Sequence, residues 1–475
     1  MAHFLIPSLV QNTAAENVAE KSTHLFIERI ARAVGLTAIK DAGMISREDN
    51  SLHTLLTDIQ KLKDADIASS WGRTTPLPDE PRVCEWWVGA GGSKCGGLSI
   101  NSDYDALRAV VSEALERHIW ARENDYFDNA IAASFSDLGQ RAIDPFTFAG
   151  YSATQRLANT RLSMSHDTPF LWINGYSLVH ERLSLIPAQI VSGLRPKEVP
   201  PEKKEPRIRE RITTGLATHS NKTEALLGGA LEVIERDAFM IMWLNKLSLP
   251  QIAHDDISRD NTALKELLER CTRYQLSVHF VHLITDAPAY AIMAIVRDPH
   301  MQTPIEVGLS AHTHASHAAE KALLEALRAR TNARGRIRAQ AGKPFTKKAS
   351  EINFGERHIY WADPSRLSTI DFLTSGEEVP LKENAWDYDS PGEHLKRIIN
   401  WCRDAKYECI YADLGRSKKN VLGLDVVFVV IPELQPLYLN EARRYEGGER
   451  LKSVPKKFGY APREPIFTDV PHPFV

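Results

Sequence analysis

The sequence predicts an α+β fold in which helices flank mixed sheets, because helical and strand patterns follow one another without strict alternation. Two further observations, on composition and on the length of apolar runs, indicate a globular protein. The 475 residues are 43% apolar and 25% charged, the usual mixture of a globular protein that buries its cores without disulfides or metals. The longest apolar runs, such as residues 426–431, are far shorter than the ~20 residues of a membrane helix.

The composition also narrows the cellular context. Lys and Arg number 58 against 61 Asp and Glu, and the formal net charge of −3 gives no field that would recruit nucleic acid or an anionic membrane. The first residues lack a secretory signal, and the five cysteines include no CxxC pair. We therefore expect a cytoplasmic protein that binds neither nucleic acid nor membrane.

The N-terminal half contains two amphipathic patterns and several less regular segments. Apolar residues at three- and four-residue steps predict helices over 18–34 and 105–122. Residues 69–97 are rich in Gly, Pro and Trp and predict no regular element, whereas 168–192 predict strand and loop. The Pro- and charge-rich stretch at 195–208 predicts a flexible loop.

The C-terminal half mixes helices and strands. Helices are predicted over 222–244, 316–332 and 393–405, and an irregular tail is predicted from Arg450 onward. The predicted strands are 276–284, 290–296, 409–412 and 426–431. We divide the chain into a helical extension over residues 1–68 and one domain over 69–475.

A short acidic motif occurs in two predicted helices. Residues 113–117 and 232–236 both read Glu-x-apolar-Glu-Arg, and at ~100° per residue the charged positions share one face of each helix. Glu224 and Gly228 lie on the same face of the second helix. A glycine there costs ~1 kcal/mol of helix propensity and leaves room for a group to approach the backbone. A third helix offers Glu325 and Arg328.

Two interpretations of this motif are open. A Glu–Arg pair four residues apart is ordinarily a surface ion pair worth ~0.3–0.5 kcal/mol. Carboxylates that repel one another on one face instead indicate a cation, and because His and Cys are absent from the motif, a hard ion such as Mg²⁺ is favoured over Zn²⁺. Such a magnesium ion shares phosphate oxygens, which the neighbouring arginines would bind.

These segments resemble the YcaO family and, within it, the azoline-forming cyclodehydratase branch. The resemblance runs from about Trp71 to the C-terminus and implies the family's ATP-binding fold without a Walker loop. Residues 89–94 accordingly depart from GxxxxGK[ST]. The segments that carry the resemblance are residues 92–98, 113–117, 168–177, 186–189, 214–217, 232–238, 323–328, 432–437 and 470–475.

The resemblance implies which residues bind ATP and Mg²⁺. The carboxylates that hold the metal with ATP are Glu113, Glu116, Glu224, Glu232, Glu235 and Glu325. The other cofactor-binding residues are Arg117, Ser220, Arg236 and Arg328. Pro471, Pro473 and Val475 would form a stiff arm that reaches the catalytic site, the alternative being a frayed terminus.

The resemblance also implies an ATP- and Mg²⁺-dependent peptide cyclodehydratase. It would convert Cys, Ser or Thr of a ribosomally made precursor peptide to thiazoline or oxazoline by phosphorylating the backbone amide oxygen. Two alternatives stay open: a YcaO enzyme that makes another backbone modification such as a thioamide, and a non-catalytic scaffold subunit that docks the precursor. Expected partners are a ThiF-like leader-binding protein and an FMN-dependent azoline dehydrogenase, around a homodimer within a larger complex.

Other clusters have simpler interpretations. His312, His314 and His317 are interpreted as a polar lead-in to the third helix rather than a zinc site, because zinc would need a distant fourth ligand. The arginines between 328 and 338 form either a solvated helix end or a site for phosphate or an acidic leader peptide. Cys84 and Cys95 are expected to be packed thiols.

Overall fold

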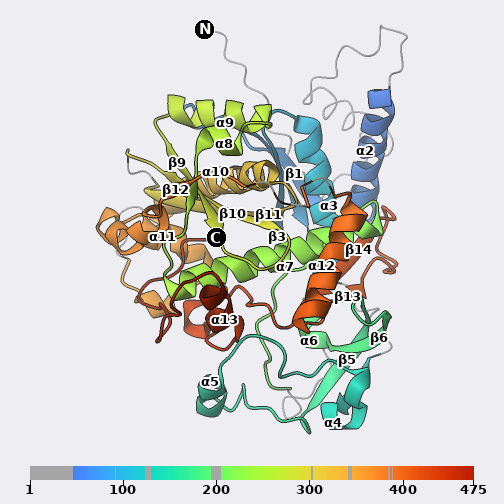
Figure 1. The fold of residues 1–475 in the computed structure, drawn as a ribbon. Coiled ribbons are helices and arrows are strands. Elements are labelled where there is room, and N and C mark those ends of the chain that lie inside the picture. The colour runs from blue at the N-terminus through green and yellow to red at the C-terminus, as the bar shows by residue number, and fades with distance from the viewer. Residues whose placement is uncertain are drawn as a thin grey trace. The chain divides into compact units, whose positions relative to one another are not determined.

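The computed structural model describes residues 47–90, 93–122, 130–193, 205–300, 303–340, 345–382, 384, 386–387 and 389–475. The chain forms two compact units. The α+β prediction is confirmed, because helices and mainly antiparallel strands follow one another irregularly (Figure 1). The predicted helix 18–34 and residues 195–204 of the predicted loop lie outside the described residues.

Of the described residues, the first unit contains 47–78, 82–90, 93–122 and 415–424. Its sheet has the order β1 (Ala68–Arg73), β2 (Cys84–Ala90) and β3 (Ser93–Ser99). Helix α3 (Asp103–Arg122) packs on β2 and β3, and α2 (Arg47–Asp64) contacts α3 and β1.

The prediction of no regular element over 69–97 was wrong, since this stretch forms all three strands of that sheet. Trp86 and Val88 point inward at alternate positions and are fully buried. Gly97 allows α3 to approach, because a Cβ atom there would lie 1.8 Å from the Ala106 carbonyl oxygen. The glycines that suggested a loop are therefore sites of close helix–strand packing.

The second unit contains two sheets. One has the strand order β11-β10-β9-β8-β12, and the other has β4-β5-β13-β14-β7 with β6 paired to β5. The strands of the first sheet are β8 (Gln251–Ile252), β9 (Ser277–Leu283), β10 (Tyr290–Arg297), β11 (Ile305–His312) and β12 (Glu378–Val379). Those of the second are β4 (Ile131–Ser134), β5 (Pro169–Ser177), β6 (Arg182–Pro187), β7 (Leu216–His219), β13 (Ile410–Asp413) and β14 (Asp425–Val430).

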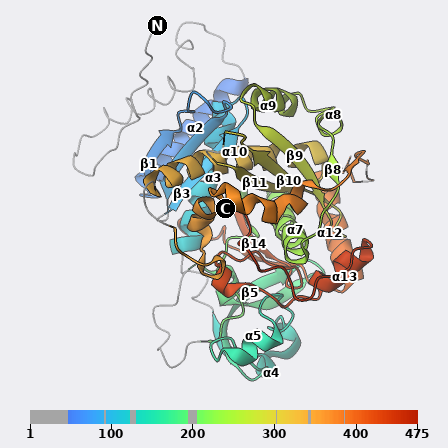
Figure 2. The ribbon, with the colours of Figure 1, turned by 90° about the vertical axis from the view of Figure 1, so that its left-hand side faces the viewer.

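Helix α7 (Lys222–Asn245) is the central element of this unit. It begins after Asn221, whose side-chain oxygen accepts the Thr223 N–H at 2.8 Å, and it ends at Lys246 in the left-handed conformation. It contacts β7 and β14 of one sheet and β10 and β11 of the other, with α12 (Pro391–Ala405) beside it (Figures 1 and 2). Helix α10 (Ala315–Gln340) covers the opposite face of β10 and β11 (Figure 1).

The predicted helices 222–244 and 393–405 and the four predicted C-terminal strands are confirmed within a few residues. Strand β11 and helix α9 (Thr262–Arg273) were not predicted, and the helix predicted over 316–332 extends to Gln340. The tail, which was predicted to be irregular, begins with a helix, α13 (Arg450–Lys457). Leu451 and Val454 lie on the buried face of this helix. The other short helices are α4 (Phe135–Leu138), α5 (Ala153–Ala158), α6 (Ala188–Val191), α8 (His254–Ile257) and α11 (Arg357–Trp361).

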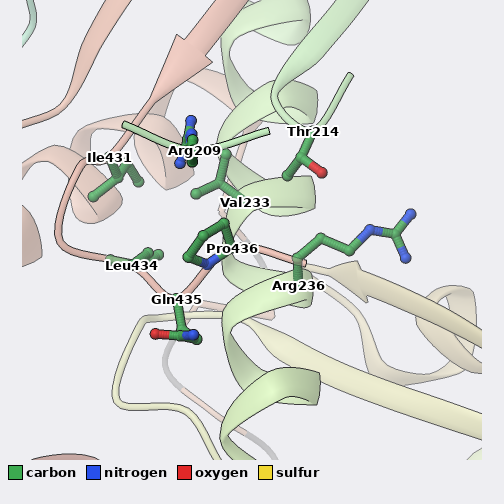
Figure 3. A pocket seen from close by; sticks show the side chains of 8 residues that line it. All are labelled: Arg209, Thr214, Val233, Arg236, Ile431, Leu434, Gln435 and Pro436. Carbon is green, nitrogen blue, oxygen red and sulfur yellow. The ribbon is translucent and has the colours of Figure 1, made fainter. Parts of the chain in front are cut away.

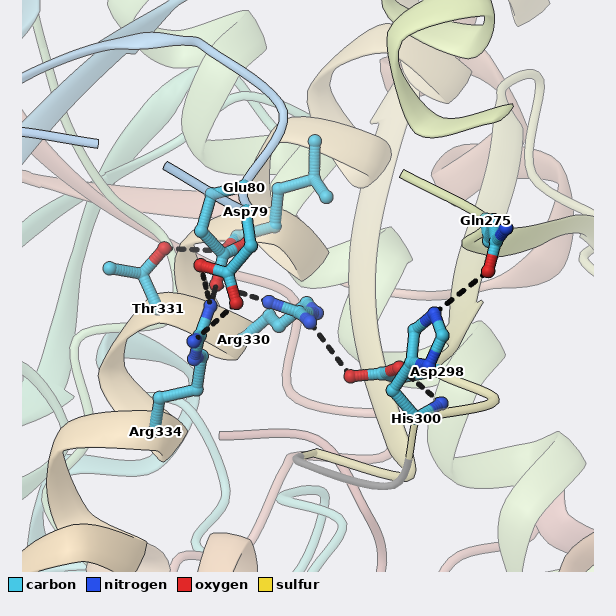
Figure 4. A network of polar contacts seen from close by, with 9 residues as sticks. Asp79, Glu80, Gln275, Asp298, His300, Arg330, Thr331 and Arg334 are labelled. Atoms are coloured by element: carbon cyan, nitrogen blue, oxygen red, sulfur yellow. Dashed lines mark hydrogen bonds and ion pairs between the residues drawn. The ribbon is translucent and has the colours of Figure 1, made fainter. Parts of the chain in front are cut away.

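A buried network of ion pairs fixes α10 within the second unit (Figure 4). Arg330 pairs with Glu80 and, at 2.7 Å, with Asp298, while Arg334 pairs with Asp79 at 2.8 Å and with Glu80 at 2.5 Å. Acidic residues of the same chain therefore neutralise these two arginines. Arg330 and Arg334 therefore form neither a solvated helix end nor a site for phosphate or an acidic peptide.

None of the helices in the described ranges combines the length and the apolar character that a membrane span requires.

Candidate functional site

The glutamates of the acidic motif share one structural environment. In each case a helix follows the edge strand of a sheet, and one carboxylate oxygen of the helix accepts a backbone N–H from that strand or the residue just before it. An edge strand has N–H groups without a strand partner, which these carboxylates satisfy. The three pairs are Glu113 Oε2 with Gly96 N at 2.9 Å, Glu232 Oε2 with Gly215 N at 2.9 Å, and Glu325 Oε2 with Leu309 N at 2.7 Å.

In the first unit, the motif lies on the partly exposed face of α3. Glu113, Glu116 and Arg117 are half-buried, whereas Ala114 and Leu115 between them are fully buried. Arg117 Nε lies 3.5 Å from Glu113 Oε1. The charged face opposite the apolar stripe is thus as the helical periodicity predicts.

In the second unit, three of the glutamates gather around Arg236. Its guanidinium lies 2.8 Å from Glu235 Oε1 and 3.6 Å from Glu232 Oε1. Glu235 Oε2 also accepts the Ala311 N–H at 3.0 Å, two residues along β11 from the N–H that binds Glu325. Carboxylates of α7 and α10, which cover opposite faces of the sheet, therefore meet at its β11 edge.

Burial and mutual repulsion both disfavour the charged form of the carboxyl groups in this cluster. Burial raises the pKa of Glu235 to about 7, with Arg236 opposing the rise and Glu325 and Glu232 adding to it. Burial also raises the pKa of Glu325, again against Arg236. The pKa of Arg236 is raised, because the three carboxylates outweigh its burial. Three carboxylates against the guanidinium groups of Arg236 and, beside Glu325, Arg328 leave an excess of negative charge that a cation would balance.

The donor set fits Mg²⁺ that is bound together with a nucleotide. The backbone N–H groups orient one oxygen of each carboxylate. The other oxygens of Glu232 and Glu235 face Arg236, and Glu235 Oε1 is buried without an aligned hydrogen bond. Among the described residues, no three His, Cys, Asp or Glu side chains already form a group that could hold a metal by themselves. Magnesium that shares phosphates and waters requires only one or two carboxylates.

The remaining predicted cofactor residues have other neighbours. Glu224 Oε2 lies 2.7 Å from His219 Nε2, a partner that the sequence did not indicate. Ser220 is exposed beside Asn221, whose side chain caps α7. Arg328 lies close enough to Glu325 to oppose the rise in the pKa of that carboxyl.

The C-terminal end is packed into the second unit rather than frayed. Pro471 and Pro473 are buried and Val475 is half-buried. The ring of Phe474 lies under the Arg236 guanidinium, with 4.4 Å between the guanidinium carbon and the ring centroid, and its carbonyl accepts Arg357 Nη1 at 3.1 Å. Phe474 is not among the predicted site residues, since an apolar ring next to a proline gives no sequence signal of a contact with Arg236.

The histidines between β11 and α10 lie close together. The ring centroids of His312, His314 and His317 are 5.2 to 5.9 Å apart, and His312 Nδ1 accepts the His314 N–H at 3.0 Å. Burial lowers the pKa of His312 to about 3, which keeps that ring neutral. This geometry agrees with the interpretation of these residues as a polar lead-in to α10.

Residues 101–435 match the YcaO family model, described as YcaO cyclodehydratase, ATP- and Mg²⁺-binding. An uncharacterised protein of Methanothermobacter thermautotrophicus is 26% identical over 287 residues, which cover 59% of this chain and 69% of that protein.

Solved structures share the fold. A heterocyclase in complex with substrate and cofactor is similar with a TM-score of 0.70 at 19% identity, over 88% of this chain and 57% of the other. YcaO from Methanopyrus kandleri bound with AMPPCP and Mg²⁺ is similar with a TM-score of 0.56 at 17% identity, over 84% of this chain and 95% of the other. The chain thus spans little more than half the length of that heterocyclase, and the predicted fold type is confirmed.

Proposed function

The chain belongs to the YcaO family, and on this basis we propose that it is an ATP- and Mg²⁺-dependent cyclodehydratase of a ribosomally made precursor peptide. The products would be thiazolines from Cys and oxazolines from Ser or Thr. The observation that carries the proposal is the gathering of Glu232, Glu235 and Glu325 around Arg236. The family's description as ATP- and Mg²⁺-binding supports it.

Each part of the cluster has a defined role in this proposal. Glu232, Glu235 and Glu325 would hold Mg²⁺ with the nucleotide, each positioned by its backbone N–H. Arg236 would contact phosphate oxygens, for which a guanidinium is well shaped. The other proposed metal carboxylates are Glu113, Glu116 and Glu224, and the other proposed nucleotide contacts are Arg117, Ser220 and Arg328.

The proposed chemistry requires no protein nucleophile. The Cys, Ser or Thr side chain of the peptide adds to the carbonyl carbon of the preceding residue, and the amide oxygen then has to leave as the ring C=N bond forms. When bound, ATP supplies the phosphoryl group that makes this oxygen a phosphate leaving group. The protein contributes positioning and charge balance, which are the main sources of rate in phosphoryl transfer.

The position of the C-terminal end favours ring formation over the other backbone modifications. Pro471, Pro473 and Val475 are proposed to border the reacting peptide, since Phe474 between them contacts Arg236. A YcaO enzyme that makes a thioamide, and a scaffold that only docks the precursor, are the alternatives that the experiment below separates.

The proposed partners follow from the same assignment. The precursor peptide would be presented by a ThiF-like leader-binding protein, and an FMN-dependent dehydrogenase would oxidise the azolines. The catalytic core would be a homodimer within this larger complex.

The decisive experiment combines the protein with its precursor, the leader-binding partner, ATP and Mg²⁺. We expect the peptide to lose one water mass per ring while one phosphate is released for each ring. Glu232→Gln and Glu235→Gln should reduce both outputs at least 100-fold, because each removes a charge from the metal site. Circular dichroism should show unchanged helix content.

The matched control is Glu269→Gln, the same change on the exposed face of α9. It should leave ring formation and phosphate release unchanged. Full turnover in Glu235→Gln would refute the metal assignment. Incorporation of sulfur into the peptide would instead identify the thioamide alternative, and an absence of any mass change would identify the scaffold.

A further inference from the structure

Arg209 is unusual among the buried arginines of this chain. In the described residues four arginines are buried: Arg209 with 7% of its surface exposed, Arg330 with 3%, Arg357 with 0% and Arg450 with 1%. Three of them contact carboxylates of the same chain. These contacts are Arg330 with Glu80 and Asp298, Arg357 with Glu441, and Arg450 with Asp237 and Asp286. No ion pair of Arg209 is found in the same ranges.

The neighbours of Arg209 do not replace a carboxylate. Its Nε atom is buried without a hydrogen-bond partner, and its guanidinium carbon lies 5.8 Å from the centroid of the Phe148 ring. The adjacent Glu210 pairs with Arg207 and, at 2.8 Å, with Arg443. Burial lowers the pKa of Arg209 to about 10, so the side chain is still a cation at neutral pH.

Arg209 lines a small cavity beside α7 (Figure 3). The lining contains a second arginine, Arg236, and Thr214, but no Asp or Glu. The volume is about 10 Å³, which is roughly the space of one water molecule. A phosphate or a carboxylate is too large for this space, whereas a monatomic ion or a water molecule fits.

We propose that this cavity binds a halide ion, chloride in the cell, which balances the charge of Arg209. A water molecule would satisfy the N–H groups but would leave the buried charge uncompensated, which is strongly unfavourable. The cavity shares Arg236 with the proposed nucleotide site, but the proposal rests on Arg209 and does not require nucleotide.

The ion would have a structural consequence next to the glutamate cluster. Thr214 directly precedes Gly215, whose N–H orients Glu232 at 2.9 Å. Because Thr214 lines the cavity, an ion bound there would lie beside the segment that leads into β7.

The first test measures thermal unfolding of the full chain without nucleotide, at constant ionic strength, in sodium chloride and in sodium gluconate. We expect Tm to be higher in chloride by roughly 2 °C or more, with saturation. Bromide should replace chloride, and sulfate should not. Arg209→Met should abolish the difference, whereas Arg259→Met, which removes an exposed ion pair with Asp256, should retain it. Equal Tm values of the wild-type protein in chloride and gluconate would overturn the proposal.

A second measurement does not depend on a variant that folds. Crystals of the wild-type protein soaked in sodium bromide should give an anomalous peak in the cavity next to Arg209. A cavity that contains only water, without anomalous signal, would overturn the proposal.

Discussion

In the glutamate cluster around Arg236, the two oxygens of each carboxylate have different roles. Glu232, Glu235 and Glu325 each use one oxygen to accept a backbone N–H, and this contact fixes the direction of the other. Arg236 balances only part of their charge. A site that is preorganised and short of positive charge is suited to a divalent cation that brings phosphate.

Glu433 is a half-buried carboxylate outside this cluster, and its titration makes the stability of the fold depend on pH. Burial raises its pKa to about 7, with Glu408 adding to the rise and backbone N–H groups opposing it. Because this pKa lies above the unfolded value of about 4.3, the folded state holds the proton more tightly, and stability is lost as the pH rises from about 4 to about 7.

We expect Glu433→Gln to reduce this loss and to raise the free energy of unfolding at pH 8 by about 2 kcal/mol. Urea denaturation at pH 5 and pH 8 measures both values. Glu446→Gln, at an exposed position, should behave as the wild-type protein does. An unchanged pH slope in Glu433→Gln would contradict the assignment.

At the scale of elements, α7 organises the site through its two different faces. On the side that packs against β7 and β14, Glu232 accepts the Gly215 N–H, and on the other side Glu235 accepts the Ala311 N–H of β11. Arg236 lies between the two carboxylates. Two adjacent glycines on the β7 side of α7 differ in the space around them. A Cβ atom at Gly229 would lie 2.7 Å from the Gly215 carbonyl oxygen, whereas one at Gly228 would meet only Ala217 at 3.8 Å.

These glycines give a matched pair of substitutions. Gly229→Ala should destabilise the protein by about 1–3 kcal/mol, because the new methyl group overlaps backbone. Gly228→Ala should stabilise α7 by up to about 1 kcal/mol and weaken ATP binding, since it fills the space beside Glu224 and Glu232. Calorimetry of unfolding and of ATP binding measures both effects. Unchanged ATP affinity in Gly228→Ala would show that nucleotide does not approach this face.

The C-terminal segment acts on the same helix through Phe474. Phe474→Leu keeps most of the apolar volume but removes the ring under Arg236, an interaction worth about 1–2 kcal/mol when desolvated. We expect ring formation to fall by about 5- to 30-fold while the far-UV spectrum is unchanged. Phe458→Leu, at an exposed ring, is the control. Equal loss in both variants would indicate a general packing effect.

At the scale of the molecule, contacts between distant parts of the sequence hold the second unit together. Arg330 binds Glu80 and Asp298, which lie far from it along the chain (Figure 4). Arg450 joins Asp237 and Asp286 in the same way. Both networks position helices that carry site residues, Glu325 on α10 and Glu235 on α7.

Arg330→Met tests the first network. It leaves Asp298 buried without that counter-charge, and we expect the free energy of unfolding to fall by about 3–5 kcal/mol in urea denaturation. Arg297→Met removes a more exposed pair with Asp371 and should cost no more than about 1 kcal/mol. A loss below 1 kcal/mol in Arg330→Met would mean that water or another group already compensates Asp298.

The sequence alone determined the elements whose signals are local. The apolar periodicity of α3, α7 and α12 and the spacing of the acidic motif were readable, because a helix repeats its faces every few residues. The same spacing, together with short segments in a fixed order, was enough to identify the family. Local patterns misjudged residues 69–97, where glycines serve helix packing, and did not indicate β11.

Only the tertiary structure decided how the site is assembled. The edge of β11 brings carboxylates of α7 and α10 to Arg236, and the C-terminal Phe474 reaches the same guanidinium from the end of the chain. The missing partner of Arg209 is likewise visible only when its surroundings are known. These features depend on contacts between residues remote in sequence, and the charge and space around a side chain are set by such contacts rather than by its neighbours along the chain.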